Sequence, residues 1–204
     1  MPPLPPEPAL LPWPAGVRRV ALLGGESSGK TTLARALAAA LHTAWVPEYG
    51  RQLWEERRHT LGVDELTHVG RVQHAWEHAH AQRPEVRAAG WLVCDTTALT
   101  TLQYSLHDHG RASDELLALS HRPYDLTVLC EPDFGFVQDG CRRDDGFRDA
   151  QHAWTLARLA ERGVQPVPAR GPVGERLALV MATLAALPPA RTLGGLPRHE
   201  ETTP

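Results

Sequence analysis

Positions 24–31 read Gly-Gly-Glu-Ser-Ser-Gly-Lys-Thr and satisfy the pattern G-x-x-x-x-G-K-[S/T]. They lie between an apolar, β-rich run at 17–23 and a stretch rich in Ala and Leu at 31–41. At such a strand-to-helix turn, glycines let successive backbone N–H groups point at phosphate oxygens, and the helix N-terminus adds a positive dipole end. We expect Lys30 to bridge the β- and γ-phosphates of ATP and Thr31 to hold Mg²⁺. The predicted ATP site comprises Gly24, Gly25, Glu26, Ser27, Ser28, Gly29, Lys30, Thr31 and Thr32.

Further apolar runs alternate with helical patterns along the rest of the chain. This alternation predicts an α/β fold of the P-loop NTPase type, similar to nucleoside and nucleotide kinases, in which a parallel five-stranded sheet carries helices on both faces. Ligands are then expected at the carboxyl ends of the strands. The expected strands are 17–23, 43–46, 91–94, 126–130 and 166–167; the expected helices are 31–41, 64–82, 98–107, 113–120, one that follows 139–147 and ends near 162, and 173–187.

The length of 204 residues suits one globular domain, which we place at 17–187. Seven of the first 14 residues are proline, so 1–16 is expected to be a disordered arm, and 188–204 a disordered tail. Hydrophobic residues make up 42% of the chain, and no apolar run is long enough to cross a bilayer, so we expect no membrane association.

Charge and cysteine content narrow the class of partner. The formal net charge is -3 and the basic residues are not clustered, which argues against nucleic-acid binding and favours a small-molecule substrate. Three scattered cysteines suggest neither a disulfide framework nor a zinc site, so a reducing cytoplasm is expected. Of the 21 basic residues only Lys30 is lysine. The sequence does not predict the oligomeric state.

Acidic and polar residues follow two of the expected strands. Asp95 ends the apolar run 91–94 and is expected to coordinate Mg²⁺ through water, with general base as a second possibility. Glu48, Tyr49 and Arg51 follow the second strand, where a carboxylate can accept a hydroxyl proton or hold a ribose diol and a tyrosine ring can stack on a base. An exposed, salt-bridged turn is the alternative there. Gln73 falls on the inward face of its helix, where its amide needs a partner.

The loop 139–147 carries arginines between glycines and is expected to be a lid. Arg142 is the best candidate to close on the transferred phosphoryl group, ahead of Arg143 and Arg148, while Gly140 and Gly146 would supply the hinge. A solvated charged face before a helix is the alternative.

Three other motifs are set aside. His74 to His78 match the zinc-peptidase spacing H-x-x-E-H, but a chain with 11 histidines produces such matches easily. Asp133 to Gly135 spell D-F-G without the other protein-kinase residues. The sequence contains no asparagine, so it cannot form the N-K-x-D guanine reader.

Taken in order, the motifs resemble the ribosylnicotinamide kinase domain of the NadR type over about residues 18–185. One departure is Thr97, where the family members have a second carboxylate. The matching segments are G-x-E-S-S-G-K-T-T, V-P-E-Y-x-R, Gln73, C-D-T, Leu99-Thr100-Thr101, Tyr124-Asp125-Leu126 and V-x-D-G-x-R.

This resemblance implies ATP-dependent phosphorylation of nicotinamide riboside to nicotinamide mononucleotide, in NAD salvage. It implies catalytic roles for Lys30, Asp95, Glu48 and Arg142, and a Mg²⁺ site at Thr31 and Asp95. The riboside would contact Glu48, Tyr49, Arg51, Gln73 and Asp95. Because the sequence lacks an H-x-G-H type motif, the reaction is expected to stop at the mononucleotide. The open alternatives are a kinase for another nucleoside or small metabolite, and an ATP-binding regulatory switch.

Overall fold

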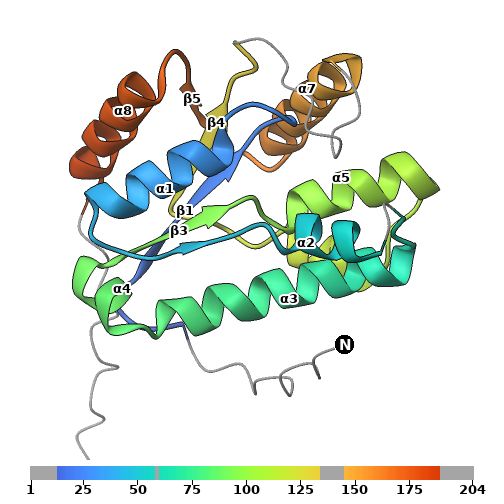
Figure 1. Cartoon of the computed structure of the whole chain (residues 1–204), viewed down its shortest axis with the longest axis horizontal. Coiled ribbons are helices and arrows are strands. Elements are labelled where there is room, and N and C mark those ends of the chain that lie inside the picture. The colour runs from blue at the N-terminus through green and yellow to red at the C-terminus, as the bar shows by residue number, and fades with distance from the viewer. Residues whose placement is uncertain (1–12, 58–59, 134–144, 189–204) are drawn as a thin grey trace, which may run out of the picture.

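The computed structural model describes residues 13–57, 60–133 and 145–188. Five strands form one parallel sheet, as expected, and their order is β2-β3-β1-β4-β5 (Figure 1). The strands are β1 (Arg18–Leu23), β2 (Trp45–Val46), β3 (Trp91–Asp95), β4 (Leu126–Cys130) and β5 (Val167–Ala169). The helices are α1 (Lys30–Ala40), α2 (Tyr49–Glu56), α3 (Val63–Ala81), α4 (Pro84–Ala89), α5 (Ala98–His109), α6 (Asp114–Ser120), α7 (Asp145–Glu161) and α8 (Val173–Ala186).

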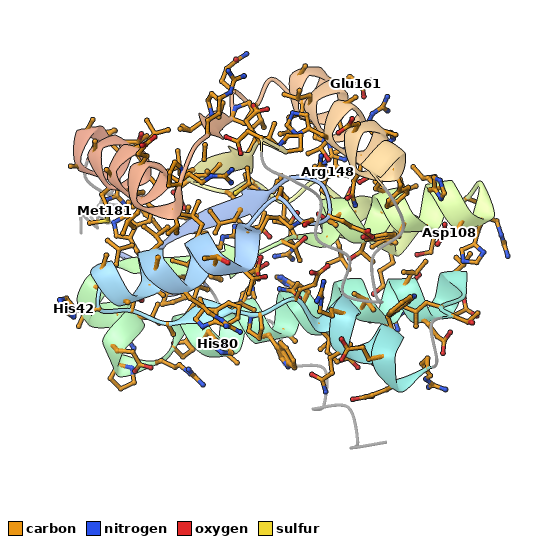
Figure 2. The ribbon with its side chains drawn as sticks, turned by 45° about the horizontal axis from the view of Figure 1, so that its top comes forward. His42, His80, Asp108, Arg148, Glu161 and Met181 are labelled. Carbon is orange, nitrogen blue, oxygen red and sulfur yellow. The ribbon has the colours of Figure 1, made fainter. Side chains whose placement is uncertain are left out.

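Alternate residues of the central strands enter separate cores on the two faces of the sheet, because side chains point to opposite faces along a strand. Val20 and Leu22 pack beneath α1 and α8, with Met181 of α8 at the edge of that core (Figure 2). Leu23 faces the other way, toward α3, α5, α6 and α7. The prediction of helices on both faces is therefore confirmed, and β1 lies at the centre with the phosphate loop at its carboxyl end.

Two helices, α2 and α4, were not predicted. The α2 helix has only eight residues and a single buried one, Leu53, so it presents almost no apolar stripe to read. The six-residue α4 has Pro84 in its first turn, and Gly90, with a φ of 72°, caps its carboxyl end. Its boundary residues are typical of a short helix, but six residues are too few for a periodic pattern.

The described chain begins at Trp13, which is already packed although it precedes the boundary at Val17 that the proline content suggested. Trp13 donates a hydrogen bond from Nε1 to the carbonyl of Val17 at 2.6 Å, and its ring packs against His78 and the guanidinium of Arg19. Residues 1–12 and 189–204, the remainder of the expected arm and tail, lie outside the described residues. Within the described ranges, no helix is long and apolar enough to cross a membrane.

The amino ends of β1 and β4 are joined by side-chain contacts. The Asp125 carboxylate accepts a hydrogen bond from the backbone N–H of Arg19 at 2.8 Å, and the N–H of Asp125 returns one to the Arg19 carbonyl at 3.0 Å. Glu77 of α3 accepts from the Arg19 guanidinium at 3.3 Å and from the Tyr124 hydroxyl at 2.8 Å. The acidic residue of the H-x-x-E-H match is thus bound by an arginine and a tyrosine.

Candidate functional site: a phosphate loop lining a cavity

The segment 24–31 forms a tight loop between β1 and α1. Ser27 and Gly29 have positive φ values of 57° and 81°. A Cβ on Gly24 would lie 2.4 Å from the carbonyl oxygen of Cys130, and one on Gly25 would lie 2.6 Å from that of Arg148. Both glycines are therefore required by the close approach of backbone from β4 and α7.

Lys30 lies at the centre of this loop. Its Nζ donates hydrogen bonds to the carbonyl oxygens of Gly24, at 3.0 Å, and Gly25, at 2.8 Å. The ammonium is therefore held where the loop backbone curves around it. A loop of this shape, with a cation at its centre and a helix N-terminus behind it, fits the triphosphate group of a nucleotide.

Thr31 and Asp95 meet although they are 64 residues apart. The hydroxyl of Thr31 donates to Oδ2 of Asp95 at 2.6 Å. The parallel pairing of Leu22 with Asp95 places the carboxylate beside the phosphate loop. Asp95 is 1% exposed, and its Oδ1 has no hydrogen-bond partner among the described residues. A hydroxyl, a carboxylate and a spare carboxylate oxygen form the hard-oxygen donor set that Mg²⁺ prefers.

Burial raises the pKa of Asp95, while the Thr31 hydrogen bond and the Lys30 charge act in the opposite direction. Burial also raises the pKa of Glu48; the Lys30 charge lowers it, and the neighbouring charges of Asp95 and Glu26 raise it. Glu48 is only partly covered and precedes the first turn of α2. A carboxylate with a raised pKa beside a phosphate site is suited to accept a proton.

A cavity of about 330 Å³ adjoins the phosphate loop. Glu48, Arg51 and Gln73, all expected near the acceptor, lie in its wall. Gln73 is 2% exposed; its Oε1 accepts from the backbone N–H of Tyr49 at 3.1 Å, and its Nε2 has no partner among the described residues. Gln73 therefore meets the expectation of an inward amide with a partner, and it retains a free donor group.

Among the described residues that line the cavity, Tyr49 is missing, although it was expected to stack on the acceptor. Its hydroxyl lies 3.2 Å from Nε2 of His68, and its ring packs edge-on against Trp76 at 5.1 Å. The reason is helical geometry: α2 begins at Tyr49, so Gly50 and Arg51 turn toward the cavity while Tyr49 turns toward α3. The expected stacking role of Tyr49 is therefore not supported by its position.

Sequence reasoning missed several residues of the cavity. Trp54 lies on α2, which was not predicted, and the others lie on predicted helices to which no such site role was given. Thr100 and Thr101 belong to a segment of the family resemblance, but neither was assigned to the site. The lining residues without a predicted site role include Trp54, Leu66, Val69, Thr100, Thr101, Tyr104, Asp108 and Gln151.

Glu26 joins the phosphate loop to the cavity. Its carboxylate accepts a hydrogen bond from the Tyr104 hydroxyl at 2.8 Å, and its backbone N–H donates to Oε1 of Gln151 at 2.8 Å. The Tyr104 ring stacks on Phe147 with 5.9 Å between ring centroids. Glu26 itself lines the cavity, and it therefore lies where the phosphate loop borders that cavity, among residues of α5 and α7.

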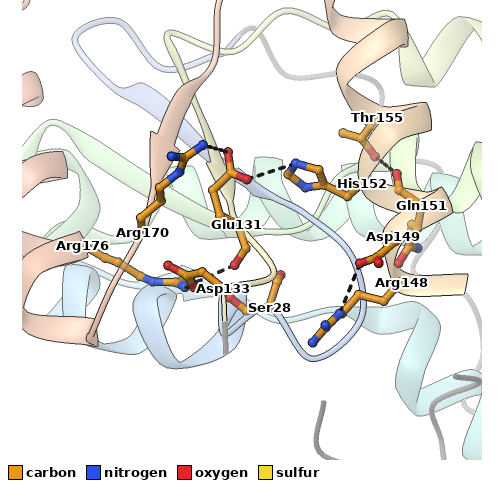
Figure 3. Close-up of polar contacts among 10 residues, drawn as sticks. All are labelled: Ser28, Glu131, Asp133, Arg148, Asp149, Gln151, His152, Thr155, Arg170 and Arg176. Atoms are coloured by element: carbon orange, nitrogen blue, oxygen red, sulfur yellow. Dashed lines mark hydrogen bonds and ion pairs between the residues drawn. The ribbon is translucent and has the colours of Figure 1, made fainter. Parts of the chain in front are cut away.

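The lid prediction is tested only in part. Arg142 and Arg143 lie outside the described residues. Arg148 is in the first turns of α7 and is 6% exposed, with its guanidinium 3.8 Å from Asp149 (Figures 2 and 3). Its backbone packs against Gly25. Arg148 is therefore part of the packed support of the phosphate loop.

Thr97 lies at the position of the family's second carboxylate. It caps α5 by accepting the N–H of Leu99 at 3.2 Å.

Two curated relatives are similar to this chain. The trifunctional NAD biosynthesis/regulator proteins NadR of Escherichia coli (strain K12) and Salmonella typhimurium (strain LT2) are each 36% identical to it over 133 residues. These alignments cover 63% of this chain and 32% of each relative, so the chain spans about a third of their length.

Solved structures share the fold. A NadR protein in complex with NR superposes with a TM-score of 0.69 at 20% identity, covering 84% of this chain and 52% of that one. A thymidylate kinase from Ehrlichia chaffeensis gives 0.56 at 14% identity, covering 84% of this chain and all of that one. The fold is therefore that of P-loop kinases, as predicted.

The AAA domain model matches residues 19–176, a range that runs from β1 into α8 and contains both the phosphate loop and the cavity. The resemblance to the NadR-type domain, read first from short motifs, is confirmed by the sequence identity to the two NadR proteins. With most of its length matched by that model, the chain belongs to the AAA domain family.

Proposed function

We propose that this protein is an ATP-dependent kinase that phosphorylates nicotinamide riboside to nicotinamide mononucleotide. The observation that carries the proposal is that one cavity is lined both by the phosphate loop, with Lys30, and by Glu48 and Gln73. A cavity with this lining suits a triphosphate and a nucleoside-sized acceptor side by side. The similarity to NadR proteins, one of them solved with NR and one with NAD and AMP-PNP, supports this acceptor and ATP.

The charges of the cavity favour a cationic acceptor. Three carboxylates, Glu26, Glu48 and Asp108, line it together with Lys30 and Arg51. The acidic groups outnumber the basic ones, and the difference grows once Lys30 is engaged with phosphates. Nicotinamide riboside carries a positive pyridinium ring, which carboxylates attract and an aromatic face such as that of Trp54 can hold. The neutral nucleosides lack this attraction.

The transfer follows from the positions of the side chains. The 5'-hydroxyl oxygen of the riboside forms a bond to the γ-phosphorus, while the bond from that phosphorus to the β–γ bridging oxygen breaks and ADP leaves. Glu48 accepts the hydroxyl proton, because it lines the acceptor cavity, whereas Asp95 lies beneath Thr31. Lys30 and the loop N–H groups stabilise the phosphate charge. Mg²⁺ held near Thr31 and Asp95 would neutralise charge on the β- and γ-oxygens.

Arg142 is proposed to close on the phosphoryl group from the segment 134–144.

We propose the reducing cytoplasm as the compartment of this protein. The buried free thiols of Cys94 and Cys130 fit that compartment.

The test is a coupled assay of ADP release with Mg-ATP and five acceptors: nicotinamide riboside, its uncharged 1,4-dihydro form, adenosine, cytidine and uridine. We expect kcat/KM to be highest for nicotinamide riboside. The dihydro form isolates the charge, since it has nearly the same shape. Preference for adenosine, cytidine or uridine would assign another nucleoside kinase, and ADP release independent of any acceptor would assign an ATP-binding switch.

A further inference from the structure

Arg176, in the first turn of α8, is a buried arginine that contacts three segments of the chain at once. It is 2% exposed. Its Nε donates to the carbonyl of Gly171 at 2.7 Å, its Nη1 to the carbonyl of Ser28 at 2.7 Å, and its Nη2 to the carbonyl of Glu131 at 3.2 Å. Figure 3 shows Arg176 with Ser28, Glu131 and Asp133. It thus joins the phosphate loop, the end of β4 and the turn that leads from β5 into α8.

The charge of Arg176 is balanced within the same cluster. Its Nη2 is paired with the carboxylate of Asp133, which also accepts the backbone N–H of Gly171. A buried guanidinium is costly unless its donors are satisfied, and here carbonyl oxygens and a carboxylate satisfy them. The planar fork of an arginine can hold several carbonyls in fixed directions, which a lysine cannot do.

We propose that Arg176 is a positioning residue for nucleotide binding, acting through the peptide bond between Ser28 and Gly29. A trans peptide is planar, so its C=O and N–H point in opposite directions. No cis peptide bond occurs in the described ranges. With the Ser28 carbonyl held toward Arg176 in α8, the Gly29 N–H points away from α8, toward the side of the loop where the phosphates bind.

The local conformation supports this step. Gly29 has a φ of 81°, in the left-handed region, so the loop reverses direction at this peptide. Ser28 and Gly29 both line the cavity next to Lys30. If the Ser28 carbonyl were released, the peptide could rotate and present an oxygen to the phosphates in place of a donor. Because oxygen repels phosphate, nucleotide affinity depends on which way this peptide faces.

The inference rests on the nucleotide site of the proposed function but not on the identity of the acceptor. The experiment is calorimetric titration of the full chain, first with Mg²⁺ and AMP-PNP and separately with nicotinamide riboside. Three variants are compared with the parent: Arg176→Met, which keeps length but removes every donor; Arg176→Lys, which keeps the charge; and Arg162→Met as the matched control. Arg162 is partly buried and donates to the Ser120 carbonyl and hydroxyl, away from the loop.

For Arg176→Met we expect the Kd of Mg-AMP-PNP to rise at least about tenfold, while the Kd of nicotinamide riboside stays within about twofold. Arg176→Lys should fall between this variant and the parent, and Arg162→Met should match the parent for both ligands. An Arg176→Met protein with parental affinity for AMP-PNP would overturn the proposal, as would an equal loss of both ligands.

Circular dichroism and thermal melting show whether Arg176→Met folds. If it does not, Arg176→Lys decides: a selective loss of AMP-PNP affinity supports the proposal, and unchanged affinity overturns it. A parent chain that binds no Mg-AMP-PNP is a separate result, which removes the nucleotide site of the proposed function and this inference with it.

Discussion

The hydroxyl of Thr31 lies 2.6 Å from Oδ2 of Asp95, and this contact joins the first turn of α1 to the last residue of β3. The hydrogen bond brings together two oxygen ligands contributed by distant parts of the sequence. The second oxygen of the same carboxylate is buried without a partner among the described residues. The pair is therefore the best supported position for a divalent cation beside the phosphate loop.

Replacing Thr31 with valine should raise the Mg²⁺ concentration that gives half-maximal ADP release by tenfold or more, because the shape is kept while the hydroxyl ligand is lost. The measurement is a Mg²⁺ titration at fixed ATP. Thr183→Val is the control, since Thr183 is a partly exposed residue of α8 and its hydroxyl donates to the Leu179 carbonyl. An unchanged Mg²⁺ requirement in Thr31→Val would remove Thr31 from the metal site.

Lys30→Ala should lower turnover by about 10²–10³-fold without unfolding the protein, because the proposed role of Lys30 is to supply charge in the transition state and its ammonium donates to loop carbonyls. A thermal melt checks the fold and the coupled assay checks the rate.

The single lysine of the chain offers an independent measurement. Modification of Lys30 by an amine-specific reagent, followed by mass spectrometry, should be slowed by Mg-ATP. Near-normal turnover of Lys30→Ala, or labelling that ATP leaves unaffected, would contradict the role of this lysine.

Glu48→Gln should raise the melting temperature at pH 7.5 while lowering activity. Burial raises the pKa of Glu48 above its usual value of 4.5, so the folded state holds the proton more tightly than the unfolded chain. The stability linked to that proton is complete below the unfolded pKa and is lost as the pH rises through the folded pKa. The amide introduced by Glu48→Gln cannot ionise, so this loss of stability is removed. For a protein of this size, each kcal/mol of stability regained raises the melting temperature by roughly 2–4 °C.

The check is a series of melts from pH 4 to pH 8, in which the difference from the parent should shrink toward pH 4. Glu85→Gln is the control, since Glu85 is exposed and its ion pair with Arg83 is long, at 3.9 Å. A Glu48→Gln protein that melts below the parent at pH 7.5 would show that the carboxylate stabilises the fold.

Trp54→Ala should raise the KM for nicotinamide riboside by about tenfold or more with a smaller effect on the KM for ATP, because the indole lines the acceptor cavity. Tyr49→Phe should change the acceptor KM by less than about twofold, since its hydroxyl faces His68. Steady-state kinetics in both substrates measure the two effects. Trp154→Phe on α7, away from the cavity, controls for loss of an indole. A larger effect from Tyr49 than from Trp54 would reverse this assignment.

Arg142→Ala should lower kcat by about 10³-fold with little change in either KM, if Arg142 stabilises charge in the transition state. Arg143→Ala, one residue further along, is the comparison. Equal and small effects from both would favour the alternative of a solvated charged loop.

The sequence predicted the strands, their alternation with helices and the phosphate loop, because all three depend on local signals, whereas the order of the strands within the sheet came only from the structure. Glycine spacing, apolar runs and helix boundaries are read within a few residues of one another, and Asp95 followed from its place at the end of such a run. Parallel pairing then brings Thr31 and Asp95 together without further information. These parts needed only the rule that ligands gather at the carboxyl ends of parallel strands.

The acceptor cavity could not be predicted in the same way. Trp54 comes from α2 and Tyr104 from α5, which are far apart in the sequence, and Tyr49 turns toward α3 because the unpredicted α2 begins at that residue. A shift of one position along a helix rotates a side chain by about 100°. Which neighbour of Glu48 faces the acceptor is therefore decided by where α2 starts, which the sequence pattern did not reveal.

The contacts between Arg19 and Asp125 lie at the opposite end of the sheet from the site. They nevertheless determine how the phosphate loop packs against the end of β4. Sliding β4 along β1 by two residues would keep every side chain on its own face, so burial of apolar surface alone does not forbid it. Such a slip would carry β4 about 6.6 Å along the sheet and remove the Cys130 carbonyl from its place against Gly24. The reciprocal hydrogen bonds of Asp125 fix the alignment. An exposed aspartate far from any ligand thus keeps the nucleotide loop in register with its neighbouring strand.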